Sequence, residues 1–268
     1  MNIQIIGMVR FSYPALSGFV RTGADAKANA AFLYDPARLE ARFQMFERLT
    51  LPSIRAQTDG DFTLGILIGD NLPGWARDRL CTAIAGMRNV RLLARPPGPQ
   101  YPVLQDAMAA LRLPDATHIA GFRLDDDDAL SMTFVERLRP LASIMAGQGA
   151  APKVIAFNRG FFLELGDMPD IYDVCERSPL GIGLTLVAPV ANHDVIFRRN
   201  HRYLPQFYTT FSDAEHPSFI RTVHRHNDSS AISTGLRGTW QPEQITRQVA
   251  RHFPFTVDEL LSLPPAGL

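Results

Sequence analysis

The segment HIAGFRL at residues 118–124 runs directly into four acidic residues, DDDD at 125–128, and this junction decides the fold. The seven residues before the acidic run are mostly apolar, which predicts a buried strand. A helix is predicted from about Met132, because apolar residues recur there at helical spacing. The acidic residues therefore lie between a strand and a helix, at the carboxyl end of the strand.

The same alternation of strand and helix extends from this junction to the N-terminus. The predicted elements are a strand at 3–9, a helix from Leu39 to Ile54 that Pro52 kinks or restarts, a strand at 61–68, a helix at 75–87, a strand at 90–93 and a helix at 103–111. Residues 12–35 lack periodicity and predict a long loop. This alternation predicts an α/β fold with a mixed, mainly parallel sheet flanked by helices.

The pattern changes after Lys153, where two predicted strands, at 154–158 and 185–188, are separated by loop-rich segments. Short helices are predicted at 245–252 and 257–261. We expect a mixed, partly antiparallel second half. Because no linker divides the chain, we expect a single domain over residues 1–268, with halves at 1–150 and 151–268.

Composition limits the classes of partner and the compartment. The 268 residues contain 27 Lys plus Arg and 27 Asp plus Glu, so no net charge attracts nucleic acid or an anionic membrane. Only two cysteines occur, which fits a reducing compartment. The first ten residues do not resemble a signal peptide, and no apolar run is long enough to cross a membrane. We expect a cytoplasmic protein without a transmembrane segment, and peripheral membrane association stays open.

The acidic run is a candidate metal site. Four adjacent carboxylates repel one another, and a cation offsets that repulsion best. Mg²⁺ and Mn²⁺ take oxygen ligands and are held by one or two carboxylates plus substrate phosphates. On an extended segment Asp125 and Asp127 point the same way, so we predict this pair as metal ligands, with Arg123 as a nearby cation. The alternative is a solvated acidic loop that caps the next helix, but the position directly after an apolar strand favours the metal.

Several further segments combine with the acidic run into a recognisable pattern. These are Arg10-Phe11, TLPSI at 50–54, Gln57-Thr58, Asp61-Phe62, the turn at 70–73 and RLDDDD at 123–128. Together they resemble the putative rhamnosyltransferase family of GT-A-like bacterial glycosyltransferases, over a span from the first strand to about Asn227. The resemblance implies a GT-A-like fold, a nucleotide-diphosphate sugar donor, and metal-dependent transfer of a sugar such as rhamnose to a glycan or other hydroxyl acceptor.

The resemblance also implies roles for individual residues. Asp125 and Asp127 match the Asp-x-Asp-like motif that links Mn²⁺ or Mg²⁺ to the donor diphosphate, with Arg123 beside it. Asp70 matches a strand-end acid that contacts the nucleoside, and Arg10 matches the basic residue next to it. Residues 1–150 then form the nucleotide-binding half, and residues 151–268 form the acceptor-side half.

Two segments of the second half supply further candidates. His224-Arg225-His226-Asn227 is similar to the family's His-Gly-x-Asn sequence, so His224 is a candidate metal ligand, although Arg225 replaces the usual glycine. A surface histidine is the alternative. If transfer inverts the anomeric carbon, a carboxylate must deprotonate the acceptor. We predict Asp213 for this role and Glu215 as second choice, with an ordinary solvated loop as the alternative.

Two other classes of protein also use acidic residues to bind metal ions. A nucleotidyltransferase that makes nucleotide sugars usually has a Gly-rich loop after its first strand, whereas this chain continues as RFSYP at 10–14. A non-catalytic module that holds calcium needs spaced oxygen ligands and a central glycine, which residues 125–130 lack. Both patterns favour a glycosyltransferase.

Overall fold

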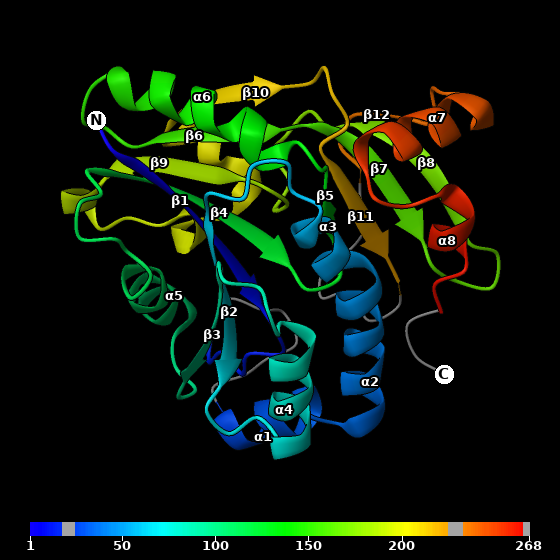
Figure 1. Ribbon diagram of the computed structural model, residues 1–268, viewed down its shortest axis with the longest axis horizontal. Helices are drawn as coiled ribbons and strands as arrows, with labels where there is room; N and C mark the ends of the chain where they lie inside the picture. The colour runs from blue at the N-terminus through cyan, green and yellow to red at the C-terminus, as the bar shows by residue number, and fades with distance from the viewer. Residues whose placement is uncertain (18–24, 225–232, 265–268) are drawn as a thin grey trace.

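The computed structural model describes residues 1–17, 25–224 and 233–264. Within these residues the larger sheet has seven strands in the order β10-β6-β9-β4-β1-β2-β3 (Figure 1). Their bounds are β1 (Ile3–Arg10), β2 (Thr63–Gly69), β3 (Val90–Arg95), β4 (His118–Asp125), β6 (Lys153–Phe157), β9 (Thr185–Pro189) and β10 (Thr209–Asp213). Only β9 runs antiparallel to its neighbours among them. The predicted mixed, mainly parallel sheet is confirmed.

Helices cover both faces of this sheet, which explains why its strands are apolar on both sides. On β1, Ile5 and Val9 pack on one face, and Ile6 and Met8 pack on the other. The first face carries α2 (Pro36–Met45), α3 (Leu51–Arg55), α4 (Gly74–Ala83) and α6 (Phe134–Gly147). The second face carries α5 (Gln100–Ala109) and the 3-10 turns η3 (Ile196–Arg198) and η4 (His201–Gln206).

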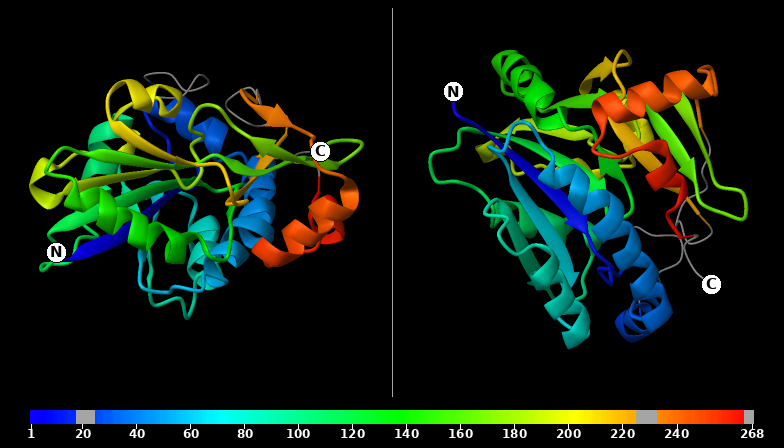
Figure 2. Two further views of the ribbon diagram at one scale, coloured as in Figure 1. Left: turned by 90° about the horizontal axis from the view of Figure 1, so that it is seen from above. Right: turned by 45° about the vertical axis from the view of Figure 1, so that its right-hand side comes forward.

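A second sheet has the strand order β12-β8-β7-β11-β5, and the sequence did not predict it. Its strands are β5 (Ala129–Leu130), β7 (Arg159–Glu164), β8 (Asp170–Cys175), β11 (Phe219–Val223) and β12 (Leu236–Arg237). The helices α7 (Pro242–His252) and α8 (Val257–Leu261) pack on it (Figure 2). One core cluster contains Ile155 of the larger sheet and Phe162 of the smaller one, so the two sheets share a core.

One prediction for the first half was wrong in detail, and another is refined by the structure. Within the predicted loop at 12–35 lies the helix α1 (Ala26–Leu33), which begins where the Asp25 side chain accepts hydrogen bonds from two backbone amides. The predicted helix at 39–54 restarts beside Pro52, as expected, because α3 begins at Leu51 with Pro52 in its first turn. It passes through a wide π turn, η1 (Phe46–Thr50), before α3, and such turns are frequent at functional sites.

The acidic run lies where the chain passes from one sheet to the other. The strand β4 of the larger sheet ends at Asp125, and β5 of the smaller sheet begins at Ala129. In the parallel pairing of β1 with β4, Arg10 is the register partner of Asp125. This places the run at the carboxyl edge of the sheet, where α/β proteins bind ligands. None of the helices in the described ranges is long and apolar enough to span a bilayer.

Candidate active site

A cavity of about 590 Å³ opens at the carboxyl ends of β1 and β4. All four aspartates of the run 125–128 line it, together with the segments after β1, α2, the start of α5, the turns η3 and η4, and β11. Seven arginines of the described chain also line it: Arg10, Arg38, Arg42, Arg123, Arg198, Arg199 and Arg221. The cavity therefore combines carboxylates that suit a cation with guanidinium groups that suit phosphate or carboxylate oxygens.

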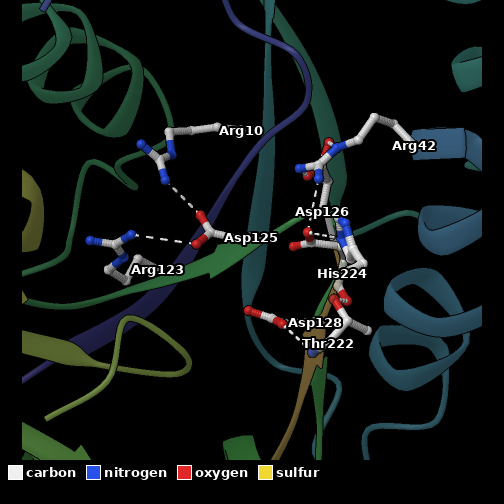
Figure 3. A network of polar contacts seen from close by, with 9 residues as sticks. Arg10, Arg42, Arg123, Asp125, Asp126, Asp128, Thr222 and His224 are labelled. Atoms are coloured by element: carbon white, nitrogen blue, oxygen red, sulfur yellow. Dashed lines mark hydrogen bonds and ion pairs between the residues drawn. The ribbon is translucent and has the colours of Figure 1, made fainter. Parts of the chain in front are cut away.

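Asp125 lies between two arginines at the ends of adjacent strands (Figure 3). Its Oδ1 is 2.6 Å from Arg10 Nη2, and its Oδ2 is 3.6 Å from Arg123 Nη2. Both guanidinium groups also lie over the ring of Phe197, at 5.6 and 5.3 Å from its centroid. Burial acts to raise the pKa of Asp125, but the two arginines outweigh it and lower the net value. Asp125 is therefore ionised.

A glycine leaves the space that Arg123 occupies. A Cβ atom at Gly181 would lie 2.9 Å from the guanidinium carbon of Arg123, which is closer than carbon atoms pack. The pairing of Arg123 with Asp125 thus depends on a residue without a side chain in the second half of the chain.

Asp126 and Asp127 share one arginine from α2. Arg42 donates a hydrogen bond to Asp126, and its Nη1 donates to Asp127 Oδ2 at 2.8 Å. His224 Nε2 lies 3.0 Å from the same Oδ2, and the side chain of His224 is buried. One guanidinium neutralises only one of two carboxylates, and His224 adds to the stabilisation of Asp127. Burial opposes ionisation of both aspartates. For Asp127, Arg42 and His224 outweigh burial and lower the pKa. For Asp126, burial and the charge of Asp127 raise the pKa to about 7.

Asp128 is held differently from the other three aspartates. Its Oδ1 accepts a hydrogen bond from the backbone amide of Thr222 at 3.0 Å, and Thr222 Oγ1 donates to the carbonyl of Asp127 at 2.8 Å. Within the described part of the chain Asp128 makes no ion pair. Burial and the charges of Asp127 and Asp125 raise the pKa of Asp128 well above its usual range. The strand β11 thus anchors the acidic turn through two hydrogen bonds.

One prediction about the acidic run was wrong: Asp125 and Asp127 do not project to one side of an extended segment. The strand ends at Asp125, and Asp126 and Asp127 form a turn. Both carboxylates reach the same cavity, but different arginines hold them, so a shared metal ion does not follow from strand alternation. The structure instead brings together Asp127 and His224, two of the three predicted metal ligands.

Asp70, the other acidic residue predicted to bind the donor, lies outside the cavity lining. Asp70 follows β2 and is exposed. It is near the cavity, because its charge adds to the effect of burial in raising the pKa of Tyr13, which does line the cavity. The role of Asp70 in nucleoside binding stays a prediction. Of the predicted His-Arg-His-Asn motif, residues 225–227 lie outside the described residues.

The two candidate bases also lie outside this lining. Asp213 ends β10, three strands from β4 and thus roughly 14 Å away at about 4.8 Å per strand, and its carboxylate is bound by Arg137. The side chain of Glu215 is 83% exposed. A general base must come within hydrogen-bond reach of the hydroxyl that it deprotonates. The assignment to Asp213 or Glu215 stays a prediction, and this placement does not favour it.

Sequence reasoning missed Arg42, His201, Arg199 and Arg221 as cavity residues. Arg42 lies on a helix whose polar face gives no functional signal, and only the packing of α2 brings it to the acidic turn. Burial, together with the charges of Arg123 and Arg202, lowers the pKa of His201 to about 3. His201 is therefore a neutral imidazole in the cavity wall at physiological pH.

A divalent cation fits this donor set if a ligand completes it. Asp127 Oδ2 and His224 Nε2 are close enough to bind one ion. No group of three or more His, Cys, Asp or Glu residues that could hold a metal occurs among residues 1–17, 25–224 and 233–264. Mg²⁺ and Mn²⁺ at phosphate sites use few protein ligands and complete their shell with substrate phosphate and water. The cavity thus provides a partial metal site that phosphate oxygens would complete.

The raised pKa of Asp126 predicts a measurable pH dependence of stability. A carboxyl whose folded pKa exceeds its unfolded value contributes stability that is full below about pH 4 and is lost as the pH rises through about 7. We expect Asp126→Asn to gain stability relative to the wild type between these limits, by a difference on the order of 2 kcal/mol. Urea unfolding of both proteins at pH 4.5 and 7.5 measures this, and a difference that does not change with pH would contradict it.

Comparison with known families identifies the class of protein. Residues 4–236 match the family model described as "Putative rhamnosyl transferase". The chain belongs to this family. The predicted family is confirmed. The mixed, mainly parallel sheet flanked by helices is the GT-A-like architecture that the family resemblance implies.

Solved structures show only distant likeness. The TarS 1-349 structure from S. aureus in complex with UDP-GlcNAc matches 87% of this chain and 62% of its own at 10% identity and a TM-score of 0.46. Rv0371C of Mycobacterium tuberculosis H37Rv in complex with manganese matches 79% of this chain and 89% of its own at 16% identity and a TM-score of 0.34. The chain thus spans about three fifths of the TarS structure. A search among curated proteins gave no match.

Proposed function

We propose that this glycosyltransferase moves a sugar from a nucleotide-diphosphate donor to a hydroxyl acceptor, with a divalent ion held by Asp127 and His224. Rhamnose is the sugar that the family description suggests. One observation carries the proposal: a carboxylate and imidazole pair and a set of arginines face one cavity at the carboxyl edge of the sheet. A cytoplasmic location stays a prediction.

The charges of the cavity suit a diphosphate. The side chains of Arg10 and Arg123 are only 10% and 12% exposed, so their interactions with an anion would be weakly screened by solvent. Arg42 bridges Asp126 and Asp127, next to the proposed position of the ion. A diphosphate and these carboxylates repel each other unless cations lie between them. We therefore assign Arg10, Arg42 and Arg123 to the diphosphate and Mn²⁺ or Mg²⁺ to Asp127 and His224.

The nucleoside is assigned to the side of the cavity that the first half of the chain builds. Tyr13 follows β1 there, and Tyr101 lies at the start of α5. Tyr101 is partly exposed and presents an aromatic ring on which a base can stack, whereas Tyr13 is buried and packs into the core. Ser12, between Arg10 and Tyr13, adopts a left-handed conformation with φ of 47°, and such backbone strain clusters at ligand sites.

Transfer itself needs a proton acceptor inside the cavity. The acceptor oxygen forms a bond to the anomeric carbon as the bond from that carbon to the diphosphate oxygen breaks, and the nucleotide diphosphate leaves with the electron pair. A bound divalent ion would stabilise the negative charge that grows on the leaving diphosphate. We assign the hydroxyl proton to Asp128 in its ionised form, because Asp128 lines the cavity and its raised pKa makes its carboxylate a stronger proton acceptor, while the charge of Arg221 favours the ionised form.

The proposal predicts that nucleotide diphosphates stabilise the folded protein more strongly when a divalent ion is present. A ligand that binds only the folded state raises the melting temperature, by an amount that grows with the logarithm of its concentration relative to the dissociation constant. A thermal-shift panel of UDP, GDP, dTDP and CDP, each with manganese or with EDTA, tests this prediction and identifies the nucleobase of the donor. At 100 times the dissociation constant the stabilisation is about 2.7 kcal/mol, a rise of a few degrees. No shift with any of the four nucleotides would contradict the proposal.

A further inference from the structure

A buried carboxylate outside the cavity lining joins two parts of the cavity wall. The side chain of Asp194 is 6% exposed, and the residue lies between the 3-10 turns η2 (Val190–Asn192) and η3. Tyr101, at the start of α5, and Arg198, in η3, both line the cavity, and both donate a hydrogen bond to this carboxylate. Asp194 therefore holds a wall residue of the first half of the chain to a wall residue of the second half.

Both oxygens of Asp194 are used in this network. Its Oδ1 accepts hydrogen bonds from the Tyr101 hydroxyl at 3.1 Å and from the backbone amide of Val195 at 2.9 Å. Its Oδ2 accepts from the Tyr208 hydroxyl at 2.9 Å and from Arg198 Nη1 at 3.2 Å. Four donors on two oxygens suit an ionised carboxylate, whereas an asparagine offers only one acceptor oxygen in the same space.

The backbone beside Asp194 is also fixed against α5. His193 has a left-handed conformation with φ of 59°, which is uncommon for a residue with a side chain. The carbonyl of His193 accepts a hydrogen bond from Gln105 Nε2 of α5 at 2.6 Å, and the same Nε2 lies 3.5 Å from the Tyr101 hydroxyl. A strained residue persists only where the surrounding contacts determine its conformation, and such strain clusters at ligand sites.

The bond to Asp194 orients the aromatic ring to which the nucleobase is assigned. Tyr101 lines the cavity, while its hydroxyl is bonded to a residue outside the lining. Burial, and then the charge and hydrogen bond of Asp194, raise the pKa of Tyr101, so the hydroxyl stays protonated and donates at neutral pH. A ring that is already held at its hydroxyl does not have to be ordered when a ligand binds, which removes an entropic cost of binding.

We infer that Asp194 is a positioning residue for the nucleotide: it holds the Tyr101 ring in the orientation in which the nucleobase stacks on it, without contacting the nucleotide itself. The inference rests on the proposed function, which places the nucleoside beside Tyr101. The metal and the diphosphate are assigned to other residues of the cavity. Asp194 should therefore affect only the part of the affinity that the nucleoside contributes.

Two probes separate these parts of the affinity: the nucleotide diphosphate that stabilises the protein most, and inorganic pyrophosphate, which lacks the nucleoside. Each is titrated with manganese by calorimetry into the full-length wild type, Asp194→Asn and Tyr101→Phe. We expect each variant to bind the nucleotide at least about threefold more weakly, because the Tyr101 ring must then be ordered on binding. Pyrophosphate affinity should stay within about twofold. A merely structural role of Asp194 would lower the melting temperature without this difference between the probes.

A double variant and a matched control locate the effect. If Asp194 acts through Tyr101, the variant with both substitutions should bind the nucleotide about as weakly as the more affected single variant, instead of showing the product of the two effects. Tyr172→Phe is the control, because the Tyr172 hydroxyl donates a 2.7 Å hydrogen bond to Glu164 in the smaller sheet, outside the cavity lining. This substitution should change neither affinity.

The outcomes separate this inference from the proposed function. If the wild type binds the nucleotide and either single variant binds it equally well, or if pyrophosphate is weakened as much as the nucleotide, the inference is overturned and the proposed function stands. The full product of effects in the double variant overturns it too. If Asp194→Asn does not fold, Tyr101→Phe compared with Tyr172→Phe decides the test. If no nucleotide diphosphate binds to the wild type, the proposed function fails and the inference falls with it.

Discussion

Asp127→Asn is expected to lower the rate of sugar transfer at least about a thousandfold and to weaken binding of the nucleotide diphosphate. The carboxylate of Asp127 contacts both Arg42 and His224 and is ionised because those groups lower its pKa. An amide has similar shape but no charge, so it binds a divalent ion poorly. Loss of several kcal/mol of transition-state stabilisation by the ion corresponds to this factor. Turnover of the nucleotide sugar and titration of the nucleotide measure the two effects.

Asp61→Asn is the matched control for this variant, because its side chain is 91% exposed and it precedes β2 at the opposite edge of the sheet. It should keep both turnover and affinity. If Asp127→Asn retains more than about a tenth of the wild-type turnover while remaining folded, the assignment of the metal to Asp127 is wrong.

The double variant Asp125→Asn with Asp127→Asn should be less stable than the wild type, although repulsion among four adjacent carboxylates alone would predict a gain in stability. Four adjacent carboxylates in sequence imply that Asn at 125 and 127 relieves repulsion. In the structure each of these two carboxylates pairs with at least one partly buried arginine, and removal of one partner of such a pair costs stability. Activity assays of these variants should therefore be run well below their melting temperatures.

Asp128→Asn is expected to lower turnover by about two to four orders of magnitude while nucleotide affinity stays within about twofold. A general base acts on the acceptor in the transition state and makes no contact with the donor diphosphate in our assignment. The retained affinity distinguishes Asp128 from Asp127, whose loss should weaken both. Parallel nucleotide titrations and turnover assays of the two variants provide the comparison.

Asp213→Asn and Glu215→Gln test the competing hypothesis, in which the general base is Asp213 or Glu215. Asp213 is bound by Arg137 at the far end of the sheet, and Glu215 is exposed, so neither variant should change turnover more than about twofold. If Asp213→Asn abolishes turnover and Asp128→Asn does not, the base lies on the β10 side, as the sequence pattern first indicated.

Six of the seven strands of the central sheet could be predicted from the sequence, since most of them are buried on both faces and read as continuous apolar runs, whereas the partly exposed edge strand β10 gives no such run. The meeting of Arg10 with Asp125 could also be anticipated, since parallel strands end at one edge and these residues are the last of theirs. The position of the acidic run in the cavity lining follows from the same argument. Its detailed geometry does not, because a turn replaces the extended backbone after Asp125.

The remaining parts of the site depend on tertiary packing that leaves no periodic signal. Strands β5 and β12 have two residues each, too short for any alternation to be read. Arg42 reaches the acidic turn only because α2 packs on the sheet beside it. Arg199 and Arg221 lie 22 positions apart in the chain and line one cavity only in the folded protein. Asp213 was predicted as the general base from its position in the sequence. The sheet order places its strand, β10, at an edge of the sheet, three strands from β4.

The central claim is that a divalent ion joins the donor diphosphate to Asp127 and His224. Calorimetric titration of the wild-type protein with the nucleotide diphosphate that the panel selects, first with manganese and then with EDTA, tests it most directly. We predict binding with manganese and an affinity at least about tenfold lower with EDTA, a difference of about 1.4 kcal/mol or more. Equal affinity under the two conditions would contradict the claim and would assign diphosphate binding to the arginines alone.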